Sequence, residues 1–293
     1  MAASKSQLIS SLLSLDNIDE NNYRSDGPHI GGVIGPNRLF GGYIAAQVYD
    51  AVRNYKKRVN DDKLVFSMHY NFVSAGDPKK QINIKIEKVG DVYTADISHD
   101  NKKIGLAHVK VDENFLESPN FPDNIVPMLD IPSITTLIEN IPGGKQRDRY
   151  SFLFDKLIFE IRPIHFVTIP APGDYRVVYY ARIQPECREQ VHEEGGIVAV
   201  TALSDFFVMQ SAKNAMNYSG LRMASGASLH HKIYFHKEYV EAIQWFLVES
   251  RTEIATGNKA KIFGHIFDSN KECVVSFIQE AYLLPATPDN SKL

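Results

Sequence analysis

The sequence has little cysteine and no long hydrophobic run. Cys187 and Cys273 are the only cysteines among 293 residues, and they do not form a CxxC pair. We therefore expect neither a disulfide framework nor a cysteine-rich zinc site, and we expect a reducing compartment. No apolar run approaches the roughly 18 to 20 residues that span a bilayer, and the start lacks the apolar stretch of a signal peptide. The sequence thus predicts neither secretion nor a membrane span.

An excess of positive charge is also lacking. The chain carries 32 Lys and Arg against 35 Asp and Glu, for a net charge of −3, and the basic residues are scattered among acids. Because binding a phosphate backbone requires a basic patch or stripe, we expect no nucleic-acid partner. Hydrophobic content of 44% and charged content of 23% are ordinary for a globular protein. The length is sufficient for two compact domains or one large one.

Prolines cluster between Ser118 and Gly144 and divide the chain into two halves. They are Pro119, Pro122, Pro127, Pro132 and Pro142. Such a density breaks regular structure and indicates a connecting segment. We predict an N-terminal domain over 5–115, a linker over 116–148, a C-terminal domain over 149–286 and a tail over 287–293.

Both halves show a helical segment together with a run of strands. In the first half, 40–52 has apolar residues at helical spacing, and strand-like runs follow at 64–73, 81–89, 92–98 and 104–111. In the second half, strands at 159–166 and 175–183 lead to the apolar segment 197–203, a helix beginning at Ser204-Asp205, and strands at 227–236, 243–251, 260–267 and 274–284. This pattern predicts an α+β fold in which an antiparallel sheet wraps a buried helix, twice.

A weak internal repeat supports the duplication. Ser67-Met-His-Tyr-Asn-Phe72 is similar to Ser228-Leu-His-His-Lys-Ile233 when a slippage of one residue is allowed. Internal repetition of this kind can indicate fold class where no single motif does.

Short motifs in a fixed order across most of the chain resemble the type II acyl-CoA thioesterases. They are Phe40-Gly41-Gly42 with Gln47, Ser67-Met-His69-x-x-Phe72 with Gly76-Asp77, Phe159-Glu-Ile-Arg-Pro163, Leu203-Ser-Asp-Phe206, Ala227-Ser-Leu-x-His231 with Phe235-His236, Trp245 with Glu249-Ser250, Gly264-x-Ile-Phe267 and Ser276-x-x-Gln279-Glu280. Each motif is individually weak, and their joint order carries the resemblance. It implies a double hotdog fold, hydrolysis of fatty acyl-CoA to free fatty acid and coenzyme A without a cofactor, and assembly into a homo-oligomer such as a dimer.

The resemblance also implies the catalytic residues. It assigns the acid to Asp205, the hydroxyl to Ser228 and the amide to Gln279, which together activate a water without a covalent serine intermediate. The residues themselves leave alternatives open, because Ser204-Asp205 before an apolar run is also a common helix N-cap. An Asp at such a position would be kept ionised by the helix dipole. Gln279 interrupts the apolar run 274–278, and a buried amide needs a partner.

Substrate contacts are expected at Gly41, Gly42, Tyr43, His69 and Phe206. The apolar members of this set would hold the acyl chain, and the two glycines would let backbone amides approach the thioester carbonyl, although a tight turn explains the glycines equally well. A metal site is not expected. His230 and His231 are adjacent and would face opposite sides of a strand, and the segment at His192 lacks the second histidine of an HExxH motif.

Four residues depart from the family pattern and keep other functions open. Ser74-Ala75 replaces the usual Arg-Pro, Asp96 stands where an arginine is usual, and His230 replaces an acid. The lost positive charge affects contacts to the coenzyme phosphates. The alternatives are a non-catalytic acyl-CoA-binding protein and a hotdog enoyl-CoA hydratase, although the Asp-x-Asn-x-x-His motif of such hydratases is absent from the sequence.

The sequence ends with Ser291-Lys292-Leu293, the tripeptide that import receptors read as a peroxisomal address at a free carboxyl terminus. Pro285 and Pro288 precede it and do not favour continuation of a strand. We therefore expect the import receptor as a partner and the peroxisomal matrix as the location.

Overall fold

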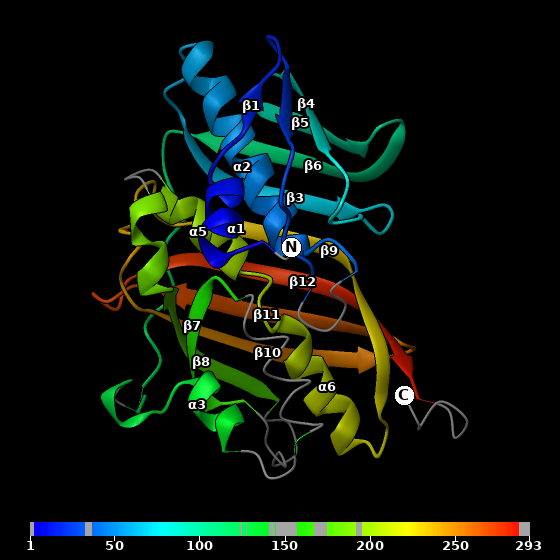
Figure 1. Cartoon of the computed structure of the whole chain (residues 1–293), viewed down its shortest axis with the longest axis vertical. Helices are drawn as coiled ribbons and strands as arrows, with labels where there is room; N and C mark the ends of the chain where they lie inside the picture. The colour runs from blue at the N-terminus through cyan, green and yellow to red at the C-terminus, as the bar shows by residue number, and fades with distance from the viewer. Residues whose placement is uncertain are drawn as a thin grey trace.

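The computed structural model of the chain describes residues 3–32, 37–123, 125–126, 128–140, 144, 157–166, 175–191 and 195–286. Within them, twelve strands form one antiparallel sheet in the order β1-β2-β4-β5-β6-β3-β9-β12-β11-β10-β8-β7 (Figure 1). The strands of the first half are β1 (Asp16–Asn17), β2 (Asn22–Ser25), β3 (Leu64–Phe72), β4 (Ile82–Val89), β5 (Val92–His99) and β6 (Lys102–Asp112). Those of the second half are β7 (Phe159–His165), β8 (Arg176–Ile183), β9 (Met223–Phe235), β10 (Phe246–Thr256), β11 (Lys259–Phe267) and β12 (Cys273–Pro285).

The two halves of the sheet repeat one topology. From its outer edge to the centre, the first half runs β1-β2-β4-β5-β6-β3 and the second half runs β7-β8-β10-β11-β12-β9. In each half two strands precede the central helix and four follow it. The halves join where β3 pairs antiparallel with β9, with Tyr70 opposite His231. The predicted fold, two helix-wrapped antiparallel sheets joined edge to edge, is confirmed.

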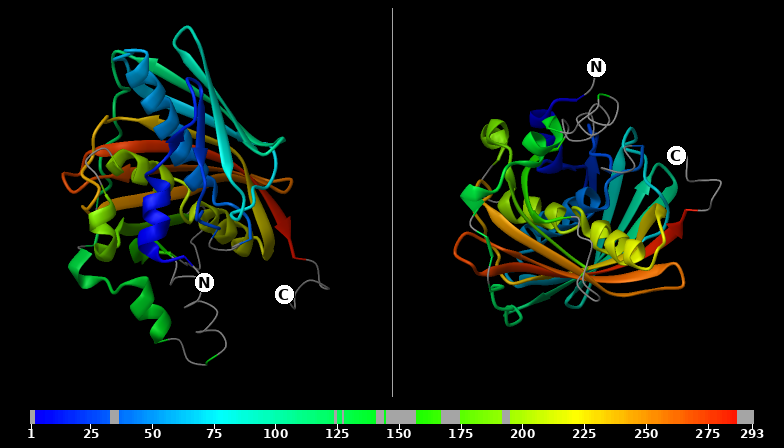
Figure 2. Two further views of the ribbon diagram at one scale, coloured as in Figure 1. Left: turned by 45° about the horizontal axis from the view of Figure 1, so that its top comes forward. Right: turned by 90° about the horizontal axis from the view of Figure 1, so that it is seen from below.

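The central helices lie on the concave side of the sheet, which curves around them (Figure 2). They are α2 (Gly41–Arg58) in the first half, and α5 (Gly195–Leu203) with α6 (Val208–Tyr218) in the second. Smaller elements are α1 (Lys5–Leu12), α3 (Ile134–Glu139), and 3-10 turns at Met128–Asp130 and Pro185–Gln190. Every residue of α5 is buried. A helix that is apolar on all sides has to be covered on all sides, and the two-domain arrangement covers it.

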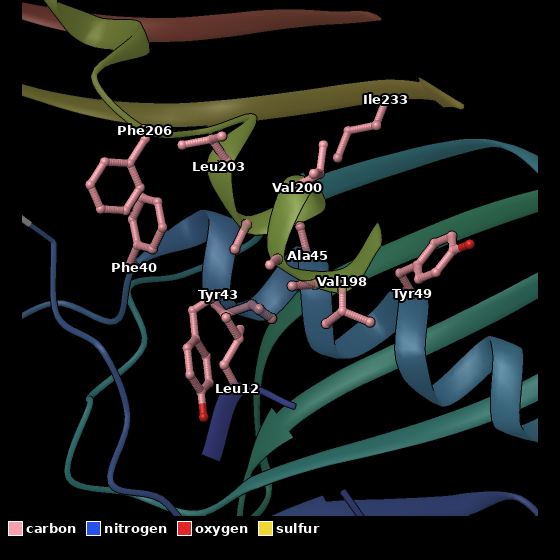
Figure 3. Packing of buried hydrophobic residues seen from close by; sticks show 14 of the residues in the cluster. Leu12, Phe40, Tyr43, Ala45, Tyr49, Val198, Val200, Leu203, Phe206 and Ile233 are labelled. Atoms are coloured by element: carbon pink, nitrogen blue, oxygen red, sulfur yellow. The ribbon is translucent and has the colours of Figure 1, made fainter. Parts of the chain in front are cut away.

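Small residues let α2 and α5 approach closely at the centre of the molecule. A Cβ added to Gly42 would lie 2.3 Å from the carbonyl oxygen of Ala202 on α5. Neither Gly41 nor Gly42 has a positive φ. Helix–helix contact therefore explains Gly42, for which the sequence had left a tight turn open. In the same core the rings of Phe40 and Phe206 pack edge to face, with their centroids 5.0 Å apart (Figure 3).

The segment Gly195–Tyr218 has the length and composition of a bilayer span, with a mean hydropathy of 1.3 in its most apolar window. Polar residues interrupt the segment, so no continuous apolar run marks it in the sequence. In the structure 78% of that window is buried, and the segment comprises two helices separated by a turn. It forms the core helix of the second half, where its apolar side chains contact the sheet and α2.

Most predicted elements are present within a few residues of their predicted bounds. Two expectations need correction: β1 and β2 precede α2 and were not predicted, and the segment that begins before Ser204 is already helical from Gly195. The predicted linker contains the short helix α3, where Ser133 caps the helix by accepting a hydrogen bond from the Thr136 amide. Parts of the linker and the whole tail 287–293 lie outside the described residues.

Candidate active site

Asp205 lies in the turn that separates α5 from α6. α5 ends at Leu203 and α6 begins at Val208, and Phe207 between them has a left-handed backbone with φ of 53°. Asp205 therefore does not cap its own helix, which corrects the helix start predicted from the sequence. Its Oδ2 instead accepts a hydrogen bond of 2.9 Å from the amide of Gly42, in the first turn of α2. The positive end of a helix dipole does face this carboxylate, but the helix comes from the other half of the chain.

Gly41 gives the carboxylate room. A Cβ added to Gly41 would lie 2.7 Å from Asp205 Oδ2 and 2.8 Å from Cζ of Phe72. Contacts that short essentially do not occur between a real Cβ and its neighbours, so any larger residue at position 41 would displace one of these two groups. The first turn of α2, the turn after α5 and the end of β3 therefore meet at one point.

A β-bulge brings Ser228 to the same point. On β9, His231 pairs with Gln279 and His230 with Glu280, but the next pair is Ser228 with Ala281, so Leu229 is an extra residue. In a regular strand Ser228 and His231 would face opposite sides of the sheet, because side chains alternate. The bulge reverses this alternation and points Ser228 toward the helices, as bulges beside functional sites commonly do. Its Oγ accepts a hydrogen bond of 2.7 Å from Nε2 of the fully buried Gln279.

These groups set the proton affinity of Asp205. Burial raises the pKa of Asp205 to about 6, and hydrogen bonds from Gln279, Gly42 and Ser228 oppose the rise. The sequence predicted an Asp kept ionised by its own helix dipole. The structure shows instead that desolvation outweighs the hydrogen bonds, so the carboxylate is more basic than an ordinary Asp. The structure thus brings Asp205, Ser228 and Gln279 together, with Gly41 and Gly42 beside them.

Two of the expected substrate-contact residues lie in the interior. Tyr43 is fully buried, and its hydroxyl bonds Ser11 at 2.7 Å, His29 and the side chain of Gln47. Figure 3 shows its ring directed toward Leu12 of α1, away from Phe206. Phe206 is 2% exposed and packs in the aromatic core beside Phe40, so it supports the turn that carries Asp205.

His69 lies on the outer face of the sheet, and the structure does not bring it to the site. Its strand neighbours Met68 and Tyr70 are buried against the helices, whereas His69 pairs with Lys232 and His108 and contacts the ring of Tyr234. Partial burial lowers the pKa of His69, and nearby Lys232, Lys110 and His108 lower it further. Its side chain therefore points away from Asp205, because alternate residues of a strand face opposite sides.

Two neighbours of the site had not been assigned to it. Phe72 touches the position of Gly41, and the family motif that includes His69 and Phe72 contained the signal. His231 belongs to the motif Ala227-Ser-Leu-x-His231, but the sequence suggested no role for it beyond the metal ligand that was not expected. Among the described residues, no three His, Cys, Asp or Glu side chains are grouped as metal ligands would be. A hollow of about 430 Å³ lies between α1 and the loop after β2. Asp205, Ser228 and Gln279 do not line this hollow.

Comparison with known proteins points to one family. Residues 142–283 match the family described as acyl-CoA thioesterase C-terminal domain. The chain is 24% identical to mouse acyl-coenzyme A thioesterase 8 over 297 residues, which cover 95% of this chain and 89% of the relative. Human acyl-coenzyme A thioesterase 8 is 22% identical with the same coverage.

The solved structure of the tesB protein of Mycobacterium avium subsp. paratuberculosis superposes with a TM-score of 0.68 at 17% identity, covering 94% of this chain and 98% of that one. That likeness establishes the fold. The match over residues 142–283, the relatives and the architecture agree: the chain is a double hotdog thioester hydrolase that is similar to the acyl-CoA thioesterases.

Proposed function

We propose that Asp205 is the general base of acyl-CoA hydrolysis in this protein and that Ser228 and Gln279 orient the attacking water. The observation that carries the proposal is the convergence of three hydrogen-bond donors, from Gln279, Gly42 and Ser228, on a carboxylate whose pKa is raised to about 6. A base near the working pH combines a large ionised fraction with useful proton affinity, and an ordinary Asp is too acidic for this.

The reaction follows from these positions. Asp205 accepts a proton from water, and the water oxygen attacks the thioester carbonyl carbon. The resulting tetrahedral oxyanion collapses, the C–S bond breaks and the coenzyme A thiolate leaves. Asp205 then donates the proton that it took from water to this thiolate. Gln279 Nε2 and the Ser228 hydroxyl, 2.7 Å apart, supply the polar groups that hold water at the angle of attack.

The acyl chain is proposed to lie beside partly buried apolar residues next to the three polar groups. Phe72, Met209 and Met223 pack against the core without being fully buried. Gly226, two residues before Ser228 on β9, lets Met209 approach, because a Cβ at this position would lie 2.8 Å from Met209 Cε. Flexible methionines at such a place accommodate chains of several shapes.

The test follows release of free thiol from acyl-CoAs of graded chain length by the purified protein. Asp205→Asn is expected to abolish release, since loss of a general base costs about 10²- to 10⁴-fold. Gln279→Ala should reduce kcat strongly. Asp61→Asn is the matched control: it neutralises another carboxylate, one that is bonded to Lys88 and Tyr93 and lies apart from the site.

Three outcomes would contradict the proposal. Acyl-CoA binding without turnover would indicate a binding protein, and hydration of an enoyl-CoA would indicate a hydratase. Full activity of folded Asp205→Asn would exclude this carboxylate as the base. Reduced turnover in Asp61→Asn would show that the assay responds to the loss of any carboxylate and not to the loss of Asp205 in particular.

The location is proposed to be the peroxisomal matrix, through recognition of Ser291-Lys292-Leu293 by the import receptor where Leu293 is the free carboxyl terminus. These residues lie outside the described part of the chain. A fluorescent protein fused to the N-terminus should enter peroxisomes, and deletion of Leu293 should leave the fusion in the cytosol. Unchanged import after the deletion would refute the address.

We also propose the domain bounds 5–115 and 149–286, with a linker over 116–148.

The protein is further proposed to form a homodimer. A sheet that ends in edge strands presents unpaired backbone groups, which a second copy can cover. Light scattering on the purified protein tests the dimer, because one chain has a mass of 33.0 kDa. A mass near 33 kDa at micromolar concentration would rule it out.

A further inference from the structure

His231 and Gln279 are neighbours across two strands, and in the described part of the chain each has one buried polar atom without an assigned hydrogen-bond partner. They are directly paired residues of β9 and β12, and both are fully buried. Among the described residues, His231 Nδ1 and Gln279 Oε1 are buried polar atoms without an assigned hydrogen-bond partner. A buried polar atom left unpaired costs about 1 to 3 kcal/mol. Two such atoms on paired neighbours therefore require an explanation.

The other ring nitrogen of His231 is already engaged. His231 Nε2 lies 2.8 Å from Ser204 Oγ, which also lies 2.7 Å from the carbonyl oxygen of Thr201. Burial lowers the pKa of His231 to about 3, and the neighbouring Gln279 side chain opposes this fall. The imidazole is therefore neutral at physiological pH and carries a single N–H, on one nitrogen or the other.

The orientation of the Gln279 amide determines which ring nitrogen of His231 carries the proton. Nε2 of Gln279 faces Ser228 Oγ, on the side where Asp205 lies, and the reverse orientation would place an oxygen against the carboxylate. With Nε2 on that side, Oε1 faces His231. An oxygen acceptor requires a donor, so the proton belongs on Nδ1. The Ser204 hydroxyl has a single proton, which must then turn from the Thr201 carbonyl to His231 Nε2, and the carbonyl keeps the hydrogen bond of 3.3 Å from the Ser204 amide.

We propose that His231 is a positioning residue that fixes the orientation of the Gln279 amide through an Nδ1–H···Oε1 hydrogen bond. Because Ser204 immediately precedes Asp205, the same imidazole links the turn that carries the base to the strand that carries the amide. An amide without this bond can turn by 180° and present its oxygen to the carboxylate and the water. The inference rests on the proposed role of Gln279 in hydrolysis.

Three substitutions separate positioning from packing. His231→Leu removes both ring nitrogens. His231→Asn keeps a donor near the place of Nδ1, and His231→Gln keeps a polar group near the place of Nε2 only. We expect kcat to fall about ten- to a hundredfold in His231→Leu and His231→Gln, as misplacement of a catalytic group does, with KM little changed. His231→Asn should restore kcat to within about threefold of wild type, because it still donates to Gln279.

His29 provides a matched control. It is also a buried histidine whose pKa is lowered by burial, to about 4, with Nδ1 3.1 Å from the Tyr43 hydroxyl and Nε2 lacking an assigned partner. His29→Leu should cost stability and leave kcat unchanged.

The inference is overturned if His231→Leu keeps wild-type kcat, or if His231→Asn is as slow as His231→Gln. If His231→Leu does not fold, the comparison of the two polar variants still decides. Gln279→Ala distinguishes the two levels of argument: full activity in that variant refutes the proposed role of Gln279, whereas an inactive Gln279→Ala beside an active His231→Leu refutes only the role of His231.

Discussion

Replacing Asp205 by Asn should stabilise the protein while it removes activity. Burial raises the pKa of Asp205 from 3.8 to about 6 in the folded chain. A tenfold change in proton affinity corresponds to about 1.4 kcal/mol, so keeping this group ionised in the folded state costs about 3 kcal/mol. Asparagine is nearly isosteric, carries no charge and can still accept the Gly42 hydrogen bond. We therefore expect Asp205→Asn to be about 1 to 3 kcal/mol more stable at pH 7.

The difference in unfolding free energy between Asp205→Asn and the wild type should depend on pH. Below pH 3.8 Asp205 is protonated in both folded and unfolded states, and its charge has no effect on stability. Between pH 3.8 and about 6 the unfolded state releases its proton first, so the wild type loses stability relative to Asp205→Asn as pH rises. Above pH 6 the difference is constant. The same ionisation should make kcat/KM of the wild type rise with pH, with half of the maximum near pH 6.

The unfolding free energies of both proteins can be measured by urea unfolding between pH 4 and pH 7.5. The pH dependence of kcat/KM of the wild type is measured over the same range. Asp61→Asn is a control of opposite sign. Burial raises the pKa of Asp61, but hydrogen bonds from Lys88 and Tyr93 outweigh it and lower the pKa to about 2. That variant should therefore be less stable than wild type at neutral pH. A stability difference for Asp205→Asn that is negative, or that does not vary with pH, would refute the reasoning, as would a rate profile with its midpoint near pH 4.

Three further substitutions test other contacts. Gly41→Ala should lower kcat with a smaller effect on stability, measured by thiol release and urea unfolding, because its Cβ would lie 2.7 Å from the Asp205 carboxylate. Tyr43→Phe should keep kcat within about twofold and lose about 1 to 2 kcal/mol of stability, because its hydroxyl bonds Ser11 in the interior; a large rise in KM would instead return Tyr43 to the substrate site. Ala107→Gln should leave turnover unchanged and destabilise the protein.

The sequence was sufficient for the architecture because hydrophobic periodicity and proline placement mark elements directly. The strand alternation of 92–98 and the apolar run of 40–52 correspond to β5 and α2. β1 has only two residues, too few for any period to be seen. The break between α5 and α6 was also hidden, since Phe207 adopts its left-handed conformation in an apolar context that carries no glycine signal.

The chemistry of the site could be predicted only in part. Residue types and their order identify an acid, a hydroxyl and an amide. Their convergence depends on a bulge at Leu229, which no local sequence pattern indicates. The raised pKa of Asp205 could not be predicted either, since desolvation depends on the packing of α2 against α5.

Because the topology repeats, the first half contains a position equivalent to that of the candidate active site. Three features show that this position lacks the groups that the second half brings together. α2 runs unbroken from Gly41 to Arg58, so the first half lacks a turn that could direct a carboxylate as Asp205 is directed. The start of α5 is covered, because a Cβ at Gly196 would lie 1.8 Å from the carbonyl oxygen of Val240. Finally, the amide has no counterpart: Gln279 pairs with His231 on β9, and the equivalent pair on β6 and β3 is Ala107 with Tyr70.

Ala107→Gln restores only the last of these features. Ala107 is fully buried and pairs with Tyr70, so a glutamine there brings an amide without the histidine, the carboxylate or the bulged hydroxyl that serve Gln279. An unpaired buried amide costs about 1 to 3 kcal/mol, and the added volume costs more. We expect urea unfolding to show this loss while thiol release per chain stays within about twofold of wild type. An increase in turnover, or turnover that survives in Ala107→Gln combined with Asp205→Asn, would show that the first half can form a site after all, and that the helix break after α5 is not what makes the second half catalytic.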